Sequence, residues 1–288
     1  MRLDGKALAD EIMGDLTKSV ETLKKHGVTP TLAVILVGSD PGSLSYIRQK
    51  QKAAERIGAK VIVEQFPETV TPEKLESAIA HYNNDSEVHG LIVQRPIPTF
   101  VGEVGDILNT VAPAKDVDGF IQHSPFEVPV AEAVIIILER IHENLKDAGL
   151  MTTEFKTWLN SQTIAIVGRG ETAGKPVAST LAKYDCATSI IHSKTPNPAS
   201  ILKNSTIIIS CVGKEHIINS KNIRPGVILL SIGLSRGKDG KMHGDYDEEN
   251  IQHTASFFTP TPGGVGPVNI ACLMKNLVDA TVLSGSVV

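Results

Sequence analysis

A glycine-rich stretch in the second half of the chain has the spacing of a phosphate-binding turn. An apolar run there ends in three glycines, Gly168, Gly170 and Gly174. When a strand turns into a helix through such glycines, bare backbone N–H groups can approach a phosphate, and the helix N-terminus adds about half a positive charge. The spacing is that of a Rossmann dinucleotide-binding turn with one extra residue before the last glycine, although a tight turn without a ligand has the same pattern. A second β run over residues 188–192, at the distance of a βαβ unit, favours the dinucleotide site.

The end of that second β run predicts which dinucleotide binds. Enzymes that use NAD usually hold the ribose 2′-hydroxyl with an Asp or Glu about 20 residues past the glycine turn. Here the run ends in His192, Ser193 and Lys194, so no acid is present to repel a 2′-phosphate. Arg169, which projects from the glycine turn, has a forked guanidinium that can bind the same phosphate. Each cation alone is also consistent with an ordinary solvated charge, but together they predict NADP as the cofactor.

Four polar side chains in the first half of the chain are candidates for a catalytic group. Tyr46 and Lys50 are four residues apart, so they share one face of a predicted helix. Gln94 ends a predicted strand, and Asp118 lies in a loop that also holds Asp116. Ligands of open α/β sheets bind beyond the carboxyl ends of strands, where Gln94 and the Asp118 loop should meet. Burial beside a cofactor would lower the pKa of Lys50 and let it transfer protons near neutral pH. The alternatives are a solvated helix face and a simple turn.

A loop with strong backbone constraints precedes the last predicted helix. Residues 259–267 contain three glycines and three prolines. Such a composition holds the backbone in one conformation and lets it approach a ligand closely. We therefore expect the backbone at Pro262, Gly263 and Gly264 either to contact a ligand or to brace a strained junction between domains.

Alternating helix and strand patterns predict two α/β domains with mainly parallel sheets, the second a Rossmann-type NAD(P)-binding domain. In the first half, apolar periodicity, caps and glycine stops predict helices over residues 8–23, over 44–57 and from 72, and strands over 32–37, 60–66 and 90–94. A helix over 130–145 and a polar connector over 142–162 follow. The second half is then predicted to hold strands at 164–167, 188–192, 205–212 and 227–232 and helices over 177–184 and 268–283.

The composition shows no feature of a nucleic-acid-binding or membrane protein. The 288 residues carry a formal net charge of −4, which leaves no basic footprint for nucleic acid. The longest apolar run is too short to span a bilayer, and no signal peptide opens the chain. Cys186, Cys211 and Cys272 are too scattered for a disulfide framework or a zinc cluster. We expect a cytoplasmic protein with no metal site and no membrane or nucleic-acid partner.

Six motifs together resemble one enzyme family. In chain order they are Tyr46-x-x-x-Lys50, Val93-Gln94-x-Pro96-x-Pro98, Lys115-Asp-Val-Asp-Gly119, Gly168-Arg169, His192-Ser193-x-Thr195 and Pro262-Gly-Gly-Val-Gly-Pro267. This series resembles the bifunctional methylenetetrahydrofolate dehydrogenase/methenyltetrahydrofolate cyclohydrolase family. The resemblance extends from about Leu3 to Val282, almost the whole chain. Six motifs in one order are far more specific than any one of them.

The resemblance implies a domain plan and two successive reactions. A folate-binding catalytic domain would comprise residues 1–145 plus 268–288, and an NADP-binding Rossmann domain residues 146–267, with the folate between them. The family oxidises 5,10-methylenetetrahydrofolate by hydride transfer to NADP and hydrolyses the methenyl product to 10-formyltetrahydrofolate. The expected partners are therefore tetrahydrofolate substrates and, because the family forms homodimers, a second copy of the chain.

The resemblance also implies roles for single residues. Lys50 would be the general acid/base of the hydrolysis, with Tyr46 stacked on or orienting the folate and Gln94 tuning Lys50. Asp118 would hold the amino group and a ring nitrogen of the pterin. The further substrate-binding residues implied are Pro262, Gly263 and Gly264. The cofactor-binding residues implied are Gly168, Arg169, Gly170, Gly174, Ser193 and Ile232.

Several positions depart from the family pattern. Arg95 stands where the family usually has Leu, and Gly170 where it has Ser. The other departures are Ser231 in place of Asp, Asn269 in place of Thr, and Pro129-Val-Ala-Glu in place of Pro-Cys-Thr-Pro after a shortened loop. Two alternatives stay open. One is a shikimate- or malate-type dehydrogenase on a similar two-domain plan, and the other is a folate-binding protein that has lost one or both activities.

Overall fold

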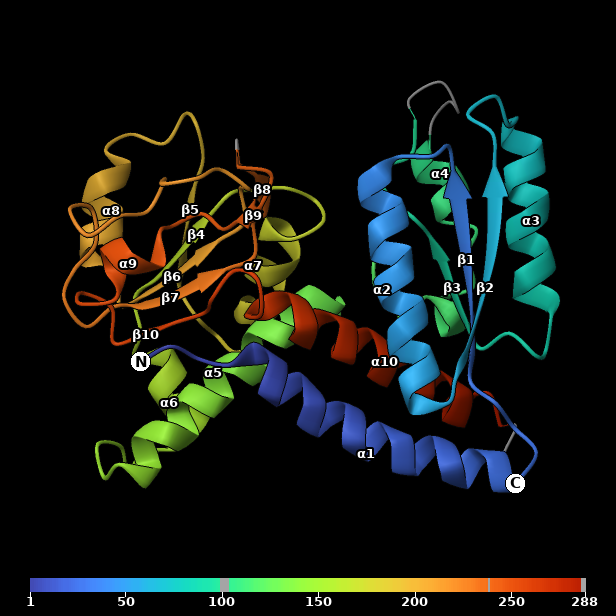
Figure 1. Ribbon diagram of the computed structural model, residues 1–288, viewed down its shortest axis with the longest axis horizontal. Helices are drawn as coiled ribbons and strands as arrows, with labels where there is room; N and C mark the ends of the chain where they lie inside the picture. Colours follow the sequence, from blue (N-terminus) through green and yellow to red (C-terminus); the bar gives the residue numbers. More distant parts are fainter. Residues whose placement is uncertain (99–103, 238, 286–288) are drawn as a thin grey trace. The chain divides into compact units, whose positions relative to one another are not determined.

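The computed structural model describes residues 1–98, 104–237 and 239–285, and the chain divides into two compact units (Figure 1). The five-stranded unit consists of Met1–Ala9 and Val130–Asn269, and the three-stranded unit of Asp10–Pro129 and Ile270–Val288. Three long helices contribute residues to both units, namely α1 (Gly5–Lys25), α5 (Pro129–Asp147) and α10 (Val265–Leu283).

The three-stranded unit is a parallel sheet in the order β2-β1-β3. Its strands are β1 (Thr31–Val37), β2 (Lys60–Phe66) and β3 (Gly90–Val93). The connecting helices α2 (Pro41–Ile57) and α3 (Pro72–Asn84) lie on opposite sides of the sheet (Figure 1). The short helices α4 (Val104–Leu108) and η2 (Pro113–Lys115) follow β3. This crossover topology brings the carboxyl ends of all three strands to one edge, where ligands of such sheets bind.

Local sequence signals explain where the helices of this unit begin and end. The Asp40 side chain caps α2 by accepting from the backbone N–H of Ser43 at 2.7 Å, and Gly58 ends the helix in the left-handed conformation. Thr71 caps α3, as predicted, with Pro72 in its first turn. All seven residues of β1 are buried because β1 is the central strand.

The five-stranded unit is a parallel sheet in the order β10-β7-β6-β4-β5. Its strands are β4 (Ile164–Val167), β5 (Thr188–Ile191), β6 (Ile207–Ser210), β7 (Ile228–Ser231) and β10 (Phe257–Phe258). The helices are α6 (Phe155–Asn160), α7 (Gly174–Lys183), α8 (Pro198–Asn204) and α9 (Glu248–Ile251), and β8 (Ser235–Arg236) pairs with β9 (Met242–His243). After β4 the chain adds β5 on one side and β6 on the other, so the strand order reverses between β4 and β6. This is the position at which doubly wound sheets bind nucleotides.

Two predicted segments need correction. The connector over residues 142–162 is not a simple polar link, because it contains α6, whose Trp158 and Leu159 are buried. The last helix begins at Val265 rather than at residue 268, so Gly266 and Pro267 belong to its first turn. Proline fits there because the N–H groups of a first helical turn have no partner within the helix.

The compact units differ from the predicted domains of residues 1–145 plus 268–288 and 146–267. The N-terminus belongs to the five-stranded unit because the N–H of Leu3 donates to the Phe258 oxygen at 2.9 Å, and the N–H of Phe258 to the Met1 oxygen at 3.0 Å. Helix α5 belongs there from Val130 onward, and the His142 ring lies 5.4 Å from the Trp158 ring of α6. These contacts join distant parts of the chain, so local patterns did not reveal them.

Candidate functional site

Lys50 is buried in the three-stranded unit although its side chain is ionisable. It shares the buried stripe of α2 with Ile47 and Ala54, and only 7% of it is exposed. Its Nζ donates a hydrogen bond to Oε1 of Gln94 at 3.0 Å. Burial lowers the pKa of the Lys50 amine from its usual value, and the negative charge of Asp118 opposes this shift. A lowered pKa makes the neutral amine available closer to neutral pH, as proton transfer requires.

The orientation of the Gln94 amide explains why an acceptor faces Lys50. Gln94 follows β3, and its backbone N–H donates to the Ile35 oxygen of β1 at 2.8 Å. Its Nε2 donates to the carbonyl oxygen of Arg95 at 2.9 Å. Since a carbonyl oxygen only accepts, the amide nitrogen must face Arg95, and the amide oxygen is left for Lys50. The structure thus brings together two predicted site residues from different elements.

Tyr46 lies one turn before Lys50 on α2, but at the surface. It is 41% exposed, whereas Lys50 is buried. Partial burial raises the pKa of the Tyr46 phenol, so the group stays protonated near neutral pH. Within the described parts of the chain, no hydrogen bond joins the two side chains. The arrangement makes the Tyr46 ring available for stacking rather than for proton exchange with Lys50.

The two aspartates of the predicted loop differ in their surroundings. Asp116 is buried, and its Oδ2 accepts from the backbone N–H of Ile121 at 2.8 Å. Burial raises the pKa of the Asp116 carboxyl, and that hydrogen bond opposes the rise. Asp118 is half-buried, and its carboxylate makes no hydrogen bond to any residue that the structure describes. Asp116 therefore braces the loop, while the Asp118 carboxylate is available to a ligand and acts electrostatically on Lys50.

The Asp118 loop is anchored by a residue that sequence patterns did not reveal. Asn276 of α10 donates from Nδ2 to the backbone oxygens of Val117 and Glu127, both at 2.9 Å. Gly119 has φ +71°, and a Cβ there would lie 2.8 Å from the Glu127 backbone, so only glycine fits. The sequence offered only an amide within a mostly apolar helix as a signal for Asn276, because its partners are 149 and 159 residues away.

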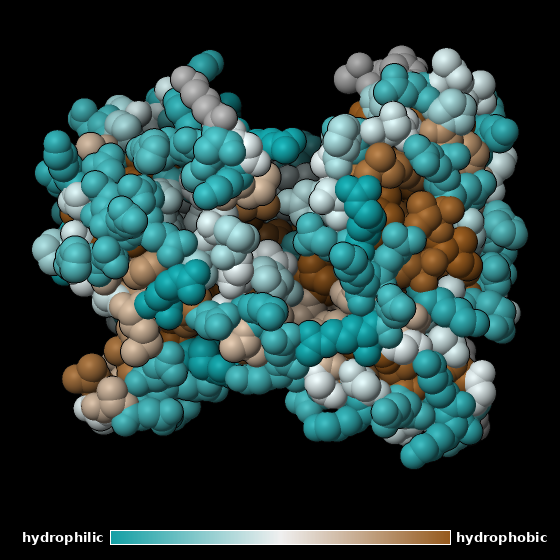
Figure 2. Space-filling model, viewed as in Figure 1, coloured by the Kyte–Doolittle hydropathy of each residue, from teal (hydrophilic) through white to brown (hydrophobic). Residues whose placement is uncertain are grey.

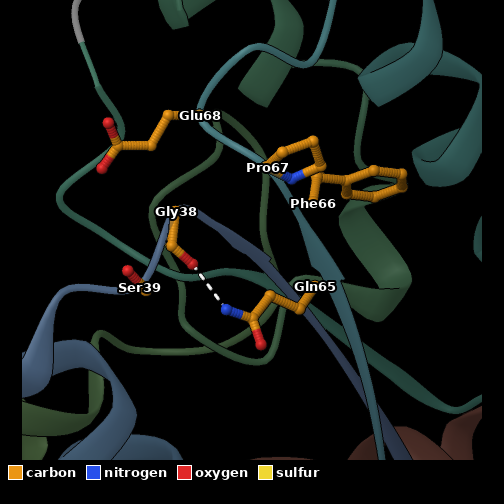
Figure 3. A pocket seen from close by; sticks show the side chains of 6 residues that line it. All are labelled: Gly38, Ser39, Gln65, Phe66, Pro67 and Glu68. Atoms are coloured by element: carbon orange, nitrogen blue, oxygen red, sulfur yellow. Dashed lines mark hydrogen bonds between the residues drawn. The ribbon is translucent and has the colours of Figure 1, made fainter.

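A pocket lies at the carboxyl ends of β1 and β2 (Figure 3). Its lining residues are Gly38, Ser39, Gln65, Phe66, Pro67 and Glu68. Nε2 of Gln65 donates to the Gly38 oxygen at 2.8 Å and ties the two strand ends together (Figure 3). None of the predicted catalytic or substrate-binding residues lines this pocket. The Lys50–Gln94 pair belongs instead to the β1–β3 side, where the strand order of the sheet reverses.

The glycine turn of the five-stranded unit has the geometry that a dinucleotide phosphate requires. Gly168 has φ +109°, which excludes other residues. A Cβ on Gly174 would overlap the Gly168 carbonyl, so Gly174 permits close packing of α7 on β4. A Cβ on Gly170 would meet no atom within 4 Å, so the backbone there is open to a ligand. No side chain caps α7; in its first turn the N–H of Lys175 donates to the Gly170 oxygen at 3.0 Å and Pro176 has no N–H, so a phosphate at this end would meet the helix dipole and the glycine backbone of the turn.

The residues expected near the ribose phosphate lie at adjacent strand ends. The N–H of Gly168 donates to the Ile191 oxygen at 2.8 Å, which places the start of the glycine turn beside the end of β5. After β5, the backbone N–H of His192 donates to Oγ1 of Thr195 at 2.9 Å and closes a turn. Arg169, Ser193 and Lys194 are all exposed around this turn. A hydroxyl and two cations at that position suit a 2′-phosphate.

The ends of β6 and β7 complete this edge of the sheet. Ile232 follows β7, is half-buried, and donates its N–H to the Ser210 oxygen at 2.8 Å. The buried Asp245 accepts the backbone N–H of Val212 at 3.2 Å and of Lys214 at 2.7 Å, and so holds the loop after β6. Sequence reasoning missed Asp245, because an acid beside glycine and tyrosine resembles a surface turn.

The predicted loop of Pro262, Gly263 and Gly264 belongs to the five-stranded unit. The N–H of Thr261 donates to Oε1 of Glu248 at 3.1 Å, and the Gly263 oxygen accepts the N–H of Lys6 at 3.1 Å. Gly263 has φ +104°, and a Cβ on Gly264 would lie 2.5 Å from the Pro260 oxygen. The loop is therefore braced by the first turn of α1 and by Glu248, while Pro262 is exposed.

Comparisons with known proteins agree with this geometry. The catalytic domain of the tetrahydrofolate dehydrogenase/cyclohydrolase family matches residues 3–118 of this chain, and the NAD(P)-binding domain of the same family matches residues 148–284. This chain belongs to the tetrahydrofolate dehydrogenase/cyclohydrolase family. The bifunctional protein FolD of Nautilia profundicola is 38% identical over 286 residues, 96% of each chain. That of Bacillus licheniformis is 38% identical over 280 residues, again 96% of each chain.

Solved structures of family members have the same fold over the full length. The FolD dehydrogenase/cyclohydrolase of Campylobacter jejuni is 32% identical with a TM-score of 0.88, covering 98% of this chain and 99% of that one. The Trypanosoma brucei enzyme, complexed with NADP cofactor and inhibitor, is 29% identical with a TM-score of 0.86, covering 99% and 98%. Family membership confirms the predicted α/β fold and both predicted activities, dehydrogenase and cyclohydrolase, and it excludes the shikimate- or malate-type alternative.

Two further observations concern metals and membranes. Among the described residues, no three His, Cys, Asp or Glu side chains gather closely enough to bind a metal ion. Within the same part of the chain, no helix has the length and apolar character needed to cross a membrane.

Proposed function

We propose that this chain oxidises 5,10-methylenetetrahydrofolate with NADP and hydrolyses the methenyl product to 10-formyltetrahydrofolate, with Lys50 transferring the protons of the hydrolysis. The observation that supports this role most directly is the environment of Lys50. Its amine is buried, its Nζ is held 3.0 Å from Oε1 of Gln94, and burial lowers its pKa. A buried amine of this kind can exchange a proton with a bound substrate near neutral pH.

In the hydrolysis, water adds to the methenyl carbon, the bond from that carbon to N5 breaks, and the formyl group stays on N10. The neutral Lys50 amine accepts a proton from the attacking water. The ammonium so formed donates a proton to N5 as the carbon–N5 bond breaks. The remaining hydroxyl proton of the water adduct leaves to solvent as the formyl C=O forms, so the hydrolysis releases one proton overall. Gln94 accepts a hydrogen bond from the lysine in both protonation states and keeps Nζ in place. Asp118 stabilises the ammonium, because its charge raises the Lys50 pKa.

We propose that the three-stranded unit binds the folate. The Asp118 carboxylate, which accepts no hydrogen bond from a described residue, would accept hydrogen bonds from the pterin amino group and a ring nitrogen, a paired arrangement that carboxylates favour. The exposed ring of Tyr46 would stack on the substrate. We also propose that the braced backbone at Pro262, Gly263 and Gly264 contacts the substrate.

We propose that the five-stranded unit binds NADP. When bound, NADP accepts the hydride from the methylene carbon. Its pyrophosphate would lie on the turn of Gly168, Gly170 and Gly174, and its 2′-phosphate against Arg169 and Ser193. Ile232 would line the cofactor site at the end of β7. The NADP complex of the Trypanosoma brucei relative supports this assignment.

A single spectrophotometric experiment tests the reaction and the cofactor. The purified chain is given methylenetetrahydrofolate with NADP or NAD, and the methenyl product is followed as it appears and then decays. We expect faster turnover with NADP, and we expect Arg169→Ala to weaken NADP much more than NAD. Lys175→Ala is a matched control, because Lys175 is exposed nearby but pairs with Glu171 at 3.3 Å. Equal efficiency with both cofactors would contradict the assignment, and folate binding without either reaction would show a protein that has lost catalysis.

We further propose a cytoplasmic homodimer. Two edge strands expose hydrophobic side chains, Ile190 on β5 and Ile62 on β2, each 41% exposed. Figure 2 shows hydrophobic surface between α2 and α3 of the three-stranded unit, where β2 is the edge. The β10 edge is paired with the N-terminal segment, which leaves β5 as the other edge of that sheet, and β2 and β3 are the edges of the three-stranded sheet; of these, β5 and β2 expose the isoleucines that a second copy would cover. The oligomeric state of the parent chain and of the Ile190→Glu and Ile62→Glu variants, measured by sedimentation, tests the proposed dimer. A parent chain that sediments as a monomer would contradict it. Cys186, Cys211 and Cys272 form no disulfide in the described parts of the chain, which favours the reducing cytoplasm.

A further inference from the structure

Arg95 is a half-buried cation at the edge of the proposed folate site. Its neighbour in the chain, Gln94, holds the Lys50 amine. The Arg95 side chain is half-buried, and among the residues that the structure describes no carboxylate pairs with its guanidinium. A half-buried guanidinium left unpaired loses part of its hydration without a compensating ion pair. An acceptor supplied by a ligand would compensate for that loss.

The position of the guanidinium is well defined. The Arg95 carbonyl accepts from Nε2 of Gln94 at 2.9 Å and lies 3.5 Å from Oγ of Ser43, which fixes the backbone. From there the side chain extends to Phe120, and the guanidinium carbon lies 4.6 Å from the centre of that ring. Phe120 follows Asp118 by two residues. Arg95 thus connects the end of β3 to the loop that carries Asp118. A guanidinium stacked on a ring still presents N–H groups at its edge.

We propose that Arg95 donates a hydrogen bond to the C4 carbonyl oxygen of the pterin, beside the ring nitrogen that Asp118 holds. This inference rests on the proposed function, because it takes Asp118 as the pterin carboxylate. The 2-amino group and N3–H of a pterin are donors, and both suit Asp118. The adjoining O4 is an acceptor and requires a donor. A leucine, the usual family residue at this position, has no side-chain donor for O4.

The glutamate end of the substrate also offers acceptors, but it fits the geometry less well. Its carboxylates are separated from the pterin by the bridge to N10 and the p-aminobenzoyl ring. Arg95 contacts Phe120, two residues past Asp118, so its guanidinium lies beside the loop that carries the proposed pterin carboxylate. The acceptor nearest to a carboxylate bound at N3 is O4.

The proposed contact makes Arg95 a specificity-determining residue. An analogue with an amino group at C4 would place a donor against the Arg95 donors. A site built to hydrogen-bond one group rejects an analogue that cannot make the bond, because the buried partner is then left unpaired. We therefore expect the chain to prefer the 4-oxo pterin over its 4-amino counterpart, and Arg95 to account for much of that preference.

Equilibrium binding of three ligands to the full chain tests the proposal independently of turnover. The ligands are tetrahydrofolate, its 4-amino-4-deoxy analogue, and tetrahydropteroate, which lacks the glutamate. We expect Arg95→Leu to reduce the 4-oxo over 4-amino preference by about 10- to 100-fold, the range of a charged hydrogen bond. Tetrahydropteroate should lose affinity as much as tetrahydrofolate does. Arg48→Leu, which removes an exposed arginine of α2, should leave the preference unchanged.

The outcomes separate the possible errors. An unchanged 4-oxo over 4-amino preference in Arg95→Leu overturns the proposal. A loss of affinity for tetrahydrofolate but not for tetrahydropteroate also overturns it, because the contact is then with the glutamate. If Arg95→Leu does not fold, Arg95→Lys replaces it in the test, because lysine keeps the charge but lacks the forked guanidinium. Arg95→Lys must then lower the 4-oxo over 4-amino preference to support the proposal. If none of the three ligands binds the parent chain, the proposed folate function itself is wrong.

Discussion

Replacement of Lys50 by methionine separates proton transfer from substrate binding. The Lys50 amine is the one group of the Lys50–Gln94 pair that can exchange protons, and a general acid/base contributes about 10²–10⁴-fold to a rate. We therefore expect Lys50→Met to slow hydrolysis of methenyltetrahydrofolate by that factor. Affinity for tetrahydrofolate should stay within a few-fold, because Asp118 and Tyr46 are unchanged.

The structure also sets the expected cost in stability. Methionine is unbranched and of similar length, so it can follow the path of the buried lysine stem. It leaves Oε1 of Gln94 without its donor, which costs about 1–3 kcal/mol. The loss of a desolvated amine offsets part of that cost, since burial disfavours the charged form of Lys50. The net change should be ~1 kcal/mol, which leaves the variant folded at room temperature.

The assay follows the decay of methenyltetrahydrofolate absorbance, corrected for its spontaneous hydrolysis, and a thermal unfolding curve is recorded for each variant. Lys52→Met is the matched control, because Lys52 is exposed on the same helix, and it should behave as the parent. A Lys50→Met variant that stays folded, binds tetrahydrofolate and hydrolyses the methenyl compound within a few-fold of the parent would refute the proton-transfer role of Lys50.

Three other substitutions test separate parts of the structure. Asp118→Asn should weaken tetrahydrofolate by about 10- to 150-fold, and it should shift the rising limb of the hydrolysis pH profile to lower pH. The limb moves to lower pH because Asp118 raises the Lys50 pKa and the neutral amine is the base. A shift to higher pH would contradict this effect of Asp118 on Lys50. Gly174→Ala should lower the melting temperature and abolish NADP binding, since a Cβ would overlap the Gly168 carbonyl, and unchanged NADP affinity would speak against this role. Asp245→Ala should destabilise the loop after β6 and cost about 1–3 kcal/mol in urea unfolding, because two backbone N–H groups lose their acceptor; a change below ~0.5 kcal/mol would show that water replaces it.

Much of the fold was predictable because its signals are local. The strand over residues 60–66 was predicted with the bounds that the structure shows, and the start of α3 followed from the Thr71 cap and Pro72. A strand or helix is encoded by the period of apolar residues and by caps within a few positions. Where local signals were weak, prediction failed, as at β10, whose two residues are too few for a period, and at α6 within a polar-looking connector.

The features of the candidate site also divide into those that the sequence determined and those that only the tertiary structure decided. The sequence by itself determined the residue types, the shared helix of Tyr46 and Lys50, and the glycine spacing of the phosphate turn, because each depends on neighbours within one element. Only the tertiary structure decided that Lys50 is buried against Gln94, 44 residues away, and that Asp116 braces the loop while the Asp118 carboxylate has no hydrogen-bond partner among the described residues. Only it showed that Asn276 anchors that loop from the other end of the chain. Burial, pKa and hydrogen-bond partners depend on which elements the sheet topology brings together, and that topology is a property of the packed chain rather than of any one segment.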